Sequence, residues 1–266
     1  MSLLPTYQQI NVPPVHELPP SVIANWLRRG WQDTRRTGAA STLHGLLVTV
    51  ACLIIAISTY GNWHLAIATF SALLLVGPIL ATGLYALSRR LDEDNAVGFA
   101  DVIAVWRHGG LSLIRFGVLL VGLAIAWIVF SVIMFELFVN IEIHTPLDFL
   151  RYVVNQGDIL FSMWMLLGAL GASLVFAGTV ITVPLLMDRD IPLSNALVIS
   201  IHTVGRNPAT LACWAMTLML LTGLSLASAM LGFILLYPVM GHASWRLYRD
   251  LVNASDLPVR TTINRN

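Results

Sequence analysis

Long runs without a charged residue constrain this chain more than any other feature. The run 209–241 contains no Asp, Glu, Lys or Arg, and four shorter apolar runs precede it. Only 11% of the residues are charged, whereas an ordinary soluble domain has about 25%. A soluble protein needs charge on its water-facing surface, and a disordered chain is polar and highly charged. The sequence therefore predicts an integral membrane protein.

The apolar runs predict six membrane-spanning helices, because one span needs about 20 mostly apolar residues. As a single helix the last run would be roughly 50 Å long, against a membrane core of about 30 Å, so it is divided near 223–228. The backbone in lipid must satisfy its own hydrogen bonds, and no alternating strand pattern is present, so the spans are helices. The predicted spans are about 41–60, 64–88, 113–138, 159–187, 209–225 and 228–248.

The arginines predict the orientation of these spans. All 15 basic residues are arginine, and all except Arg151 lie on the side of the membrane that holds both termini. By the positive-inside rule, both termini are cytoplasmic. No cleavable signal peptide is evident, because the first 40 residues are polar. We therefore expect a flexible cytoplasmic tail over 1–20, a membrane domain over 21–252 and a second cytoplasmic tail over 253–266.

Three similar units are predicted along the chain. Segments 21–38, 96–110 and 192–208 each precede an odd-numbered span and carry apolar residues at helical spacing, which is typical of a helix lying in the membrane interface. Each even-numbered span contains a proline that can break the helix: Pro78, Pro184 or Pro238. The predicted fold is an all-α, polytopic six-helix bundle made of three repeats, each an interfacial helix followed by two transmembrane helices.

Several stretches resemble the DUF2189 family of predicted integral membrane proteins of bacteria. They are Gly30, Trp31 and Asp33 near the start, VGPILATGLYALSRRLDE, VPLLMDRDI, GRNP, and the ending YPVMGHASWRLYRDLV, together covering about 20–252. The resemblance implies an integral protein of the bacterial inner membrane. It supplies no activity, and therefore no functional residue.

Charged residues near the ends of the spans are the first candidate positions. Arg115 either extends to the lipid headgroups or forms a buried contact inside the bundle. Glu136 is either exposed at the outer interface or handles protons or cations. Asp188, Arg189 and Arg249 form either intrachain ion pairs and helix caps or a binding site.

Histidines and small residues supply the other candidates. His44 and His242 lie near the cytoplasmic ends of spans and would ligate a haem only if they faced each other across the bundle. The small residues over 168–173 predict close helix packing, with a pore lining as the alternative. Trp26, Trp31 and Trp245 fall near predicted interfaces, as in an aromatic belt.

Enzymatic chemistry is not expected, because no nucleophile elbow, zinc-protease motif, phosphate-binding loop or carboxylate pair within a span occurs. We therefore predict no catalytic residue, no metal site and no cofactor. Nucleic-acid binding is not expected, because the basic residues serve as the topology signal. The expected partners are the lipid bilayer and either further copies of this chain or the subunits of a membrane complex.

Two functions remain open. The predicted repeat and the span-breaking prolines favour transport or sensing of a small solute, because repeats often frame a central pathway. The scarcity of charged residues within the spans favours the alternative, a non-catalytic accessory or assembly subunit of a larger membrane complex, for example a respiratory one.

Overall fold

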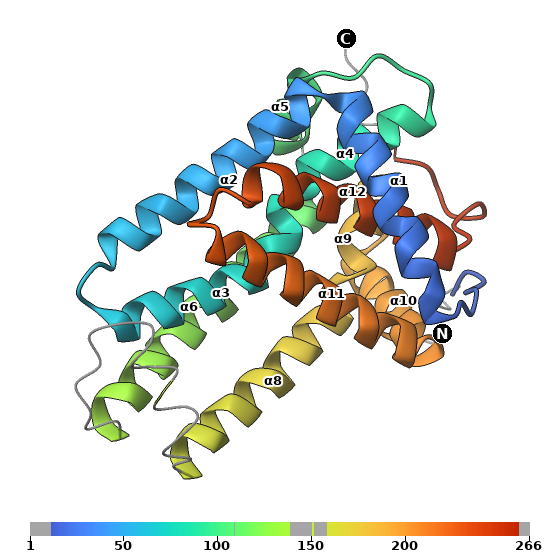
Figure 1. Ribbon diagram of the computed structural model, residues 1–266. Helices are drawn as coiled ribbons and strands as arrows, with labels where there is room; N and C mark the ends of the chain where they lie inside the picture. Colours follow the sequence, from blue (N-terminus) through green and yellow to red (C-terminus); the bar gives the residue numbers. More distant parts are fainter. Residues whose placement is uncertain (1–11, 109, 139–150, 152–158, 261–266) are drawn as a thin grey trace, which may run out of the picture.

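The computed structural model describes residues 12–108, 110–138, 151 and 159–260, and these residues form a helical bundle (Figure 1). The helices before residue 139 are η1 (Pro20–Val22), α1 (Ile23–Thr37), α2 (Ala39–Ser58), α3 (Trp63–Leu80), α4 (Thr82–Asp92), α5 (Phe99–His108) and α6 (Leu111–Phe138). Those after residue 158 are α8 (Ile159–Thr179), α9 (Thr182–Asp188), α10 (Leu193–Arg206), α11 (Pro208–Ala227) and α12 (Phe233–Leu251). The described residues contain no strand, which confirms the all-α class.

Five stretches within the described residues are long and apolar enough to cross a membrane. They match the first five predicted spans and comprise Ala39–Ser58, Leu65–Asp92, Leu111–Glu136, Phe161–Asp188 and Pro208–Ala227. The sixth predicted span, 228–248, falls on α12, which is helical but does not belong to this set. The charged and polar residues in its second half lower its mean hydropathy, so the count of six spans is not confirmed.

Local chemistry explains where the long helices break. The turn between α8 and α9 lies at residues 180–181, because Pro184 lacks an N–H and its ring crowds the carbonyl of Val180. The turn between α3 and α4 lies at Ala81, three residues after Pro78. Pro238 lies inside α12, which continues through it. The turn before α12 lies at residues 228–232, beyond the predicted 223–228, and includes two residues with positive φ, Ala229 and Met230.

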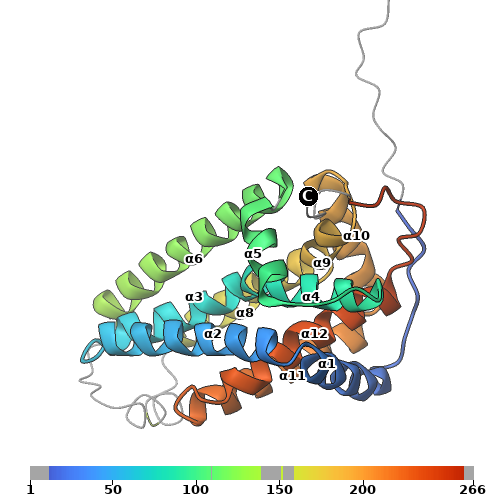
Figure 2. The same cartoon turned by 90° about the horizontal axis from the view of Figure 1, so that it is seen from above.

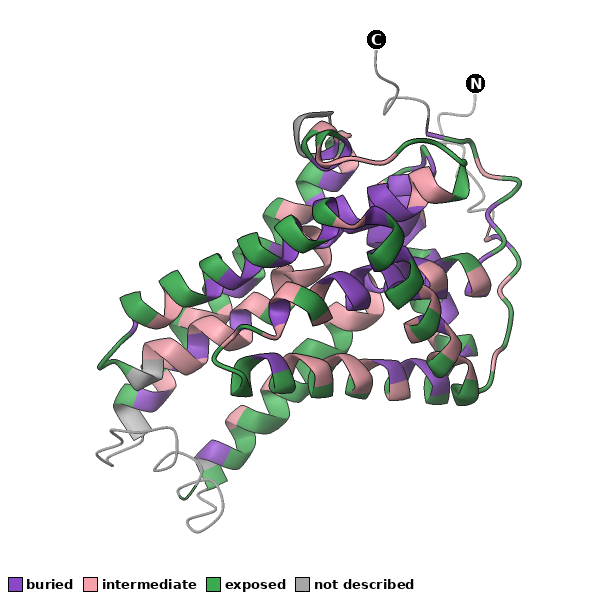
Figure 3. Cartoon of the chain, turned by 45° about the horizontal axis from the view of Figure 1, so that its top comes forward, coloured by how far each residue is buried: buried purple, intermediate pink, exposed green. Residues whose placement is uncertain are grey.

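Helix α12 is the centre of the bundle. It contacts α1, α2, α4, α9 and α11, and its residues from Pro238 to Trp245 are buried. α1 and α11 lie on one side of the molecule and α6 on the other (Figure 2). Buried residues gather where α12 meets its neighbours, whereas the outer parts of α6 and α8 are largely exposed (Figure 3). The apolar surface of these two helices suits a lipid environment rather than water.

The three short segments predicted as helices are α1, α5 and α10, and each directly precedes a long apolar helix. In each unit a further helix or broken helix pair follows: α3 with α4, α8 with α9, and α12. The short helices therefore lie where they were predicted, while the three-unit repeat is not confirmed.

Both predicted tails are held against the helices where they are described. His16 N donates to the carbonyl of Leu251, and Asn253 N donates to Pro14. Near the other end, Arg260 N donates to the carbonyl of Asp188. Residues 12–19, expected to be flexible, therefore form a strap across the end of α12, while residues 1–11 and 261–266 lie outside the described residues.

We predict that Gly30→Ala destabilises the bundle, because α1 crosses α12 at this glycine. A Cβ at Gly30 would lie 2.7 Å from the carbonyl oxygen of Val239 and 2.8 Å from the Cβ of Ala243. Overpacking of this kind costs about 1–3 kcal/mol, so thermal unfolding in detergent should begin at a lower temperature. The control is Gly122→Ala on α6, where a Cβ meets open space. An unchanged midpoint for Gly30→Ala would contradict this crossing.

Candidate functional site: a buried polar network on α12

His242 lies at the centre of a network of buried polar side chains. Its Nε2 lies 2.8 Å from Ser41 Oγ on α2, and its Nδ1 lies 2.7 Å from Ser88 Oγ on α4. Ser88 donates to Asp33 Oδ2 on α1 at 3.2 Å, and Ser41 Oγ lies 2.6 Å from Thr37 Oγ1. All five residues are buried, so α1, α2, α4 and α12 are joined through this one imidazole.

Counting the available hydrogens on each side chain shows which group donates and which accepts in this network. Ser88 has one hydroxyl hydrogen and gives it to the Asp33 carboxylate, so its oxygen accepts from His242 Nδ1–H. In a neutral imidazole the other nitrogen is an acceptor, so Ser41 donates to His242 Nε2. Thr37 Oγ1 donates its single hydrogen to the backbone carbonyl of Asp33 at 2.8 Å, so it is a close neighbour of Ser41 and not a further donor in the series. The hydrogen bonds therefore run in one direction from α2 to the Asp33 carboxylate.

Asp33 is held by Arg246, one turn beyond His242 on α12. Arg246 Nε donates to Asp33 Oδ2 at 2.7 Å, and its Nη1 pairs with Asp92 Oδ1 on α4. Trp245 Nε1 also donates to Asp92, at 2.9 Å. Burial raises the pKa of the Asp33 carboxyl, because it disfavours the charged form, while Arg246 and Ser88 act in the opposite direction. Arg246 thus pairs with two carboxylates that come from different helices.

A second cluster surrounds the predicted candidate Asp188 at the end of α9. Tyr248 OH donates to Asp188 Oδ2 at 2.6 Å, Arg189 Nε lies 3.1 Å from the same oxygen and Arg249 Nη1 lies 3.4 Å from it. Arg89 Nε lies 3.8 Å from Asp188 Oδ1. Asp188, Arg189 and Arg249 therefore come together in intrachain ion pairs, one of the two alternatives expected for them.

The two predicted histidines both point into the bundle. His44 Nε2 donates to the carbonyl of Leu80 at 2.8 Å, which lies at the break between α3 and α4. The His44 ring stacks on Tyr237 of α12, with centroids 6.0 Å apart, and Tyr237 OH donates to Gly77. His44 thus stabilises a helix break, while His242 connects four helices.

Other candidates lie outside this network. Arg115 and Glu136 are both exposed on α6, so Arg115 does not form the buried contact considered for it. On α8, Gly168 packs on Trp127 of α6, where a Cβ would lie 2.8 Å from the indole. The remaining small residues of the run, Ala169 and 171–173, are exposed.

Sequence reasoning missed the residues that hold α12. Trp26 and Trp245 were expected at the membrane interface, but both are buried, and Trp26 Nε1 donates to Asp250 on α12. Asp33 was named only among the residues that resemble the family, and Ser88 was not named by itself. Gly30, Asp33 and Thr37 recur at helical spacing on one face of α1, and this small and polar stripe could have indicated a buried contact with another helix.

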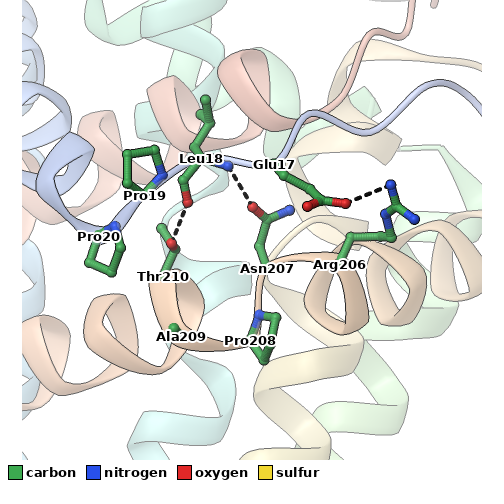
Figure 4. A pocket seen from close by; sticks show the side chains of 9 residues that line it. All are labelled: Glu17, Leu18, Pro19, Pro20, Arg206, Asn207, Pro208, Ala209 and Thr210. Carbon is green, nitrogen blue, oxygen red and sulfur yellow. Dashed lines mark hydrogen bonds and ion pairs between the residues drawn. The ribbon is translucent and has the colours of Figure 1, made fainter.

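A cavity of about 300 Å³ lies apart from the network, between the N-terminal strap and the start of α11 (Figure 4). The strap is fixed here because Asn207 Oδ1 accepts from Leu18 N and Thr210 donates to the Leu18 carbonyl. Glu17 and Arg206, both exposed, form an ion pair at its rim. These contacts hold the strap in place, and they provide partners for the polar groups that line the cavity.

The described helices and their exposed apolar surfaces define a multi-pass helical membrane protein. Residues 66–188 match the model of the DUF2189 family, described as a predicted integral membrane protein. The resemblance is therefore confirmed over this part of the chain, which contains Ser88, Asp92 and Asp188 but ends before α12. No curated protein and no solved structure matches the chain.

We predict that Arg246→Met strongly destabilises the fold. Asp33 would lose its ion-pair partner while its side chain is only 3% exposed, and breaking a buried pair from one side costs about 3–5 kcal/mol. The double variant Asp33→Asn/Arg246→Met should lose much less than the sum of the two single variants, because no buried charge is then left alone.

Thermal unfolding of all three variants in detergent checks this prediction. The control is Arg206→Gln, which removes an exposed pair worth about 0–1 kcal/mol. Additive losses in the double variant would show that Asp33 and Arg246 do not depend on each other.

Proposed function

We propose that this protein moves or senses a small solute at the membrane and that the proton is the species its buried network handles. The observation that carries the proposal is the continuous series of hydrogen bonds from Ser41 through His242 and Ser88 to Asp33. Chains of His, Asp and hydroxyl groups inside helical bundles are suited to proton transfer. Every link is 3.2 Å or shorter.

The surroundings of the imidazole support the same proposal. Burial of His242 disfavours the charged imidazolium, so the ring is neutral and relays protons through one donor nitrogen and one acceptor nitrogen. The ionisable groups that act on His242 or extend the network are Asp33 on α1, His44 on α2, Asp92 on α4 and Arg246 on α12. Arg246 and Asp92 are 14% and 24% exposed, so the network reaches water at this end of the bundle. A proton gained or lost there would change the contacts of α12 with three helices.

We propose the inner membrane as the location, with both termini in the cytoplasm. The fourteen arginines on one predicted side support this orientation. We also propose that α12 is the sixth membrane helix and that the three units are repeats, because the order of short and long helices recurs. The polar half of α12 is surrounded by other helices, which removes the cost of placing its side chains in lipid.

We predict that proton handling depends on His242. Proteoliposomes with a trapped pH indicator measure proton flux under an imposed pH gradient. Intrinsic fluorescence reports on the eight tryptophans, of which Trp245 lies beside the network. Wild-type protein should dissipate the gradient faster than empty vesicles if it transports, or should show a pH-dependent fluorescence change without flux if it senses. His242→Gln should abolish whichever response occurs.

Two further variants separate this role from simple stabilisation. Ser88→Ala cuts the link to Asp33 with little change in volume and should reduce the response by at least tenfold, while the variant stays folded in detergent. His202→Gln, at an exposed position on α10, is the matched control and should behave as the wild type. If wild-type protein shows neither flux nor a pH-dependent change, the network is structural and the proposal is wrong.

The alternative, an accessory or assembly subunit, is favoured by the exposed part of α8. Ala169 and residues 171–173 are exposed in the single chain, and small residues allow another helix to approach closely in lipid. Extraction from the native membrane with a mild detergent tests this alternative. A stoichiometric partner lost in Ala172→Phe would support it, and a particle containing only this chain would exclude it.

A further inference from the structure

The outward face of α1 carries three arginines and a tryptophan. Arg28, Trp31 and Arg35 follow one another at spacings of three and four residues, and Arg36 lies beside them. The arginines are exposed and Trp31 is 41% exposed. We call these four residues the α1 basic face. The opposite side of α1 packs on α12 through buried residues that include Trp26 and Gly30.

The carboxylates nearest to the α1 basic face are paired with other arginines. Asp33, which is the acidic residue of α1, is buried and pairs with Arg246. Arg29, which lies half-buried at the flank of the helix, pairs with Asp250. Within the described part of the chain, Arg28, Arg35 and Arg36 form no ion pair, and Arg28 bonds only to the amide oxygen of Asn25. Arg29 therefore stabilises the contact between α1 and α12, whereas Arg28, Arg35 and Arg36 remain exposed and without a carboxylate partner among the described residues.

The position of α1 places the basic face at the end of the spans. Gly38, with a φ of 50°, ends α1 directly before the apolar helix α2, and α1 turns away from the direction of α2 (Figure 1). α1 lies at the edge of the molecule, without another element outside it (Figure 2). A helix that leaves a span in this way lies at the level of the lipid headgroups, where tryptophan is favoured.

We propose that the α1 basic face binds the headgroups of anionic phospholipids. Charge complementarity identifies the partner, because three unpaired guanidinium groups match the phosphates of an anionic leaflet. The half-exposed indole of Trp31 between them suits the boundary between headgroups and acyl chains. Each arginine near such a surface strengthens the attraction about fivefold, so the three together supply on the order of a hundredfold.

Energy transfer in nanodiscs tests this binding with the full-length chain. A donor dye is attached to Ala24→Cys, at an exposed position on the same side of α1, after Cys52 and Cys213 are replaced by alanine. Acceptor-labelled phosphatidylglycerol and phosphatidylcholine are compared as trace lipids in a phosphatidylcholine bilayer. We expect the anionic lipid to be enriched near the donor at low salt, and the enrichment to fall as salt rises.

The variant Arg28→Gln/Arg35→Gln/Arg36→Gln should reduce this enrichment to that of phosphatidylcholine, with an unchanged unfolding temperature. Arg206→Gln, an exposed arginine on α10 that is paired with Glu17, is the control and should leave the enrichment intact. Equal energy transfer from both lipids to wild-type protein would overturn the proposal and leave an acidic protein as the partner of this face. Enrichment that survives the triple substitution would also overturn it.

Discussion

A carboxylate that lies among packed helices must be neutralised, and much of this structure follows from that requirement at Asp33. Removing an isolated charge from water is too costly for a fold of ordinary stability. Arg246 supplies the opposite charge and also binds Asp92, so one guanidinium fixes α12 against both α1 and α4. Trp245 and Ser88 then complete the hydrogen bonds of the two carboxylates. The ion pairs of Arg246 with Asp33 and Asp92 fix the position of α12, and apolar contacts surround these pairs.

The polar contacts of α12 and the apolar surfaces of α6 and α8 have different roles. α12 is held by directional contacts at one end of the bundle, where close crossings such as that at Gly30 leave little space. The outer parts of α6 and α8 expose large apolar side chains, for example Leu166 and Leu174, and in lipid this surface carries no penalty. The organised chemistry of the molecule is therefore concentrated at the end where the arginines gather.

Hydrophobic run length predicted the helices well, because a charge-free run of about 20 residues has few alternatives. It could not predict which polar residues meet, since these contacts join segments far apart in the sequence. Asp33 and Arg246 are separated by 213 positions, and no local pattern encodes that distance. Trp26 and Trp245 show the same limit: a tryptophan near the end of a span fits either an interface or a buried helix crossing. The ordered strap over residues 12–19 was missed because its stabilising partners, Leu251 and Asn207, lie near the other end of the chain.

The pairing of the first helix with the last has a consequence for biosynthesis. At about 5–20 residues per second, a ribosome needs roughly ten to forty seconds to proceed from Asp33 to Arg246. During that interval the nascent chain holds an unneutralised carboxylate beside helices that are already inserted. A chain truncated before α12 would lack Arg246 and leave Asp33 without this partner. The ion pair that neutralises Asp33 therefore forms only after the chain has been made as far as Arg246.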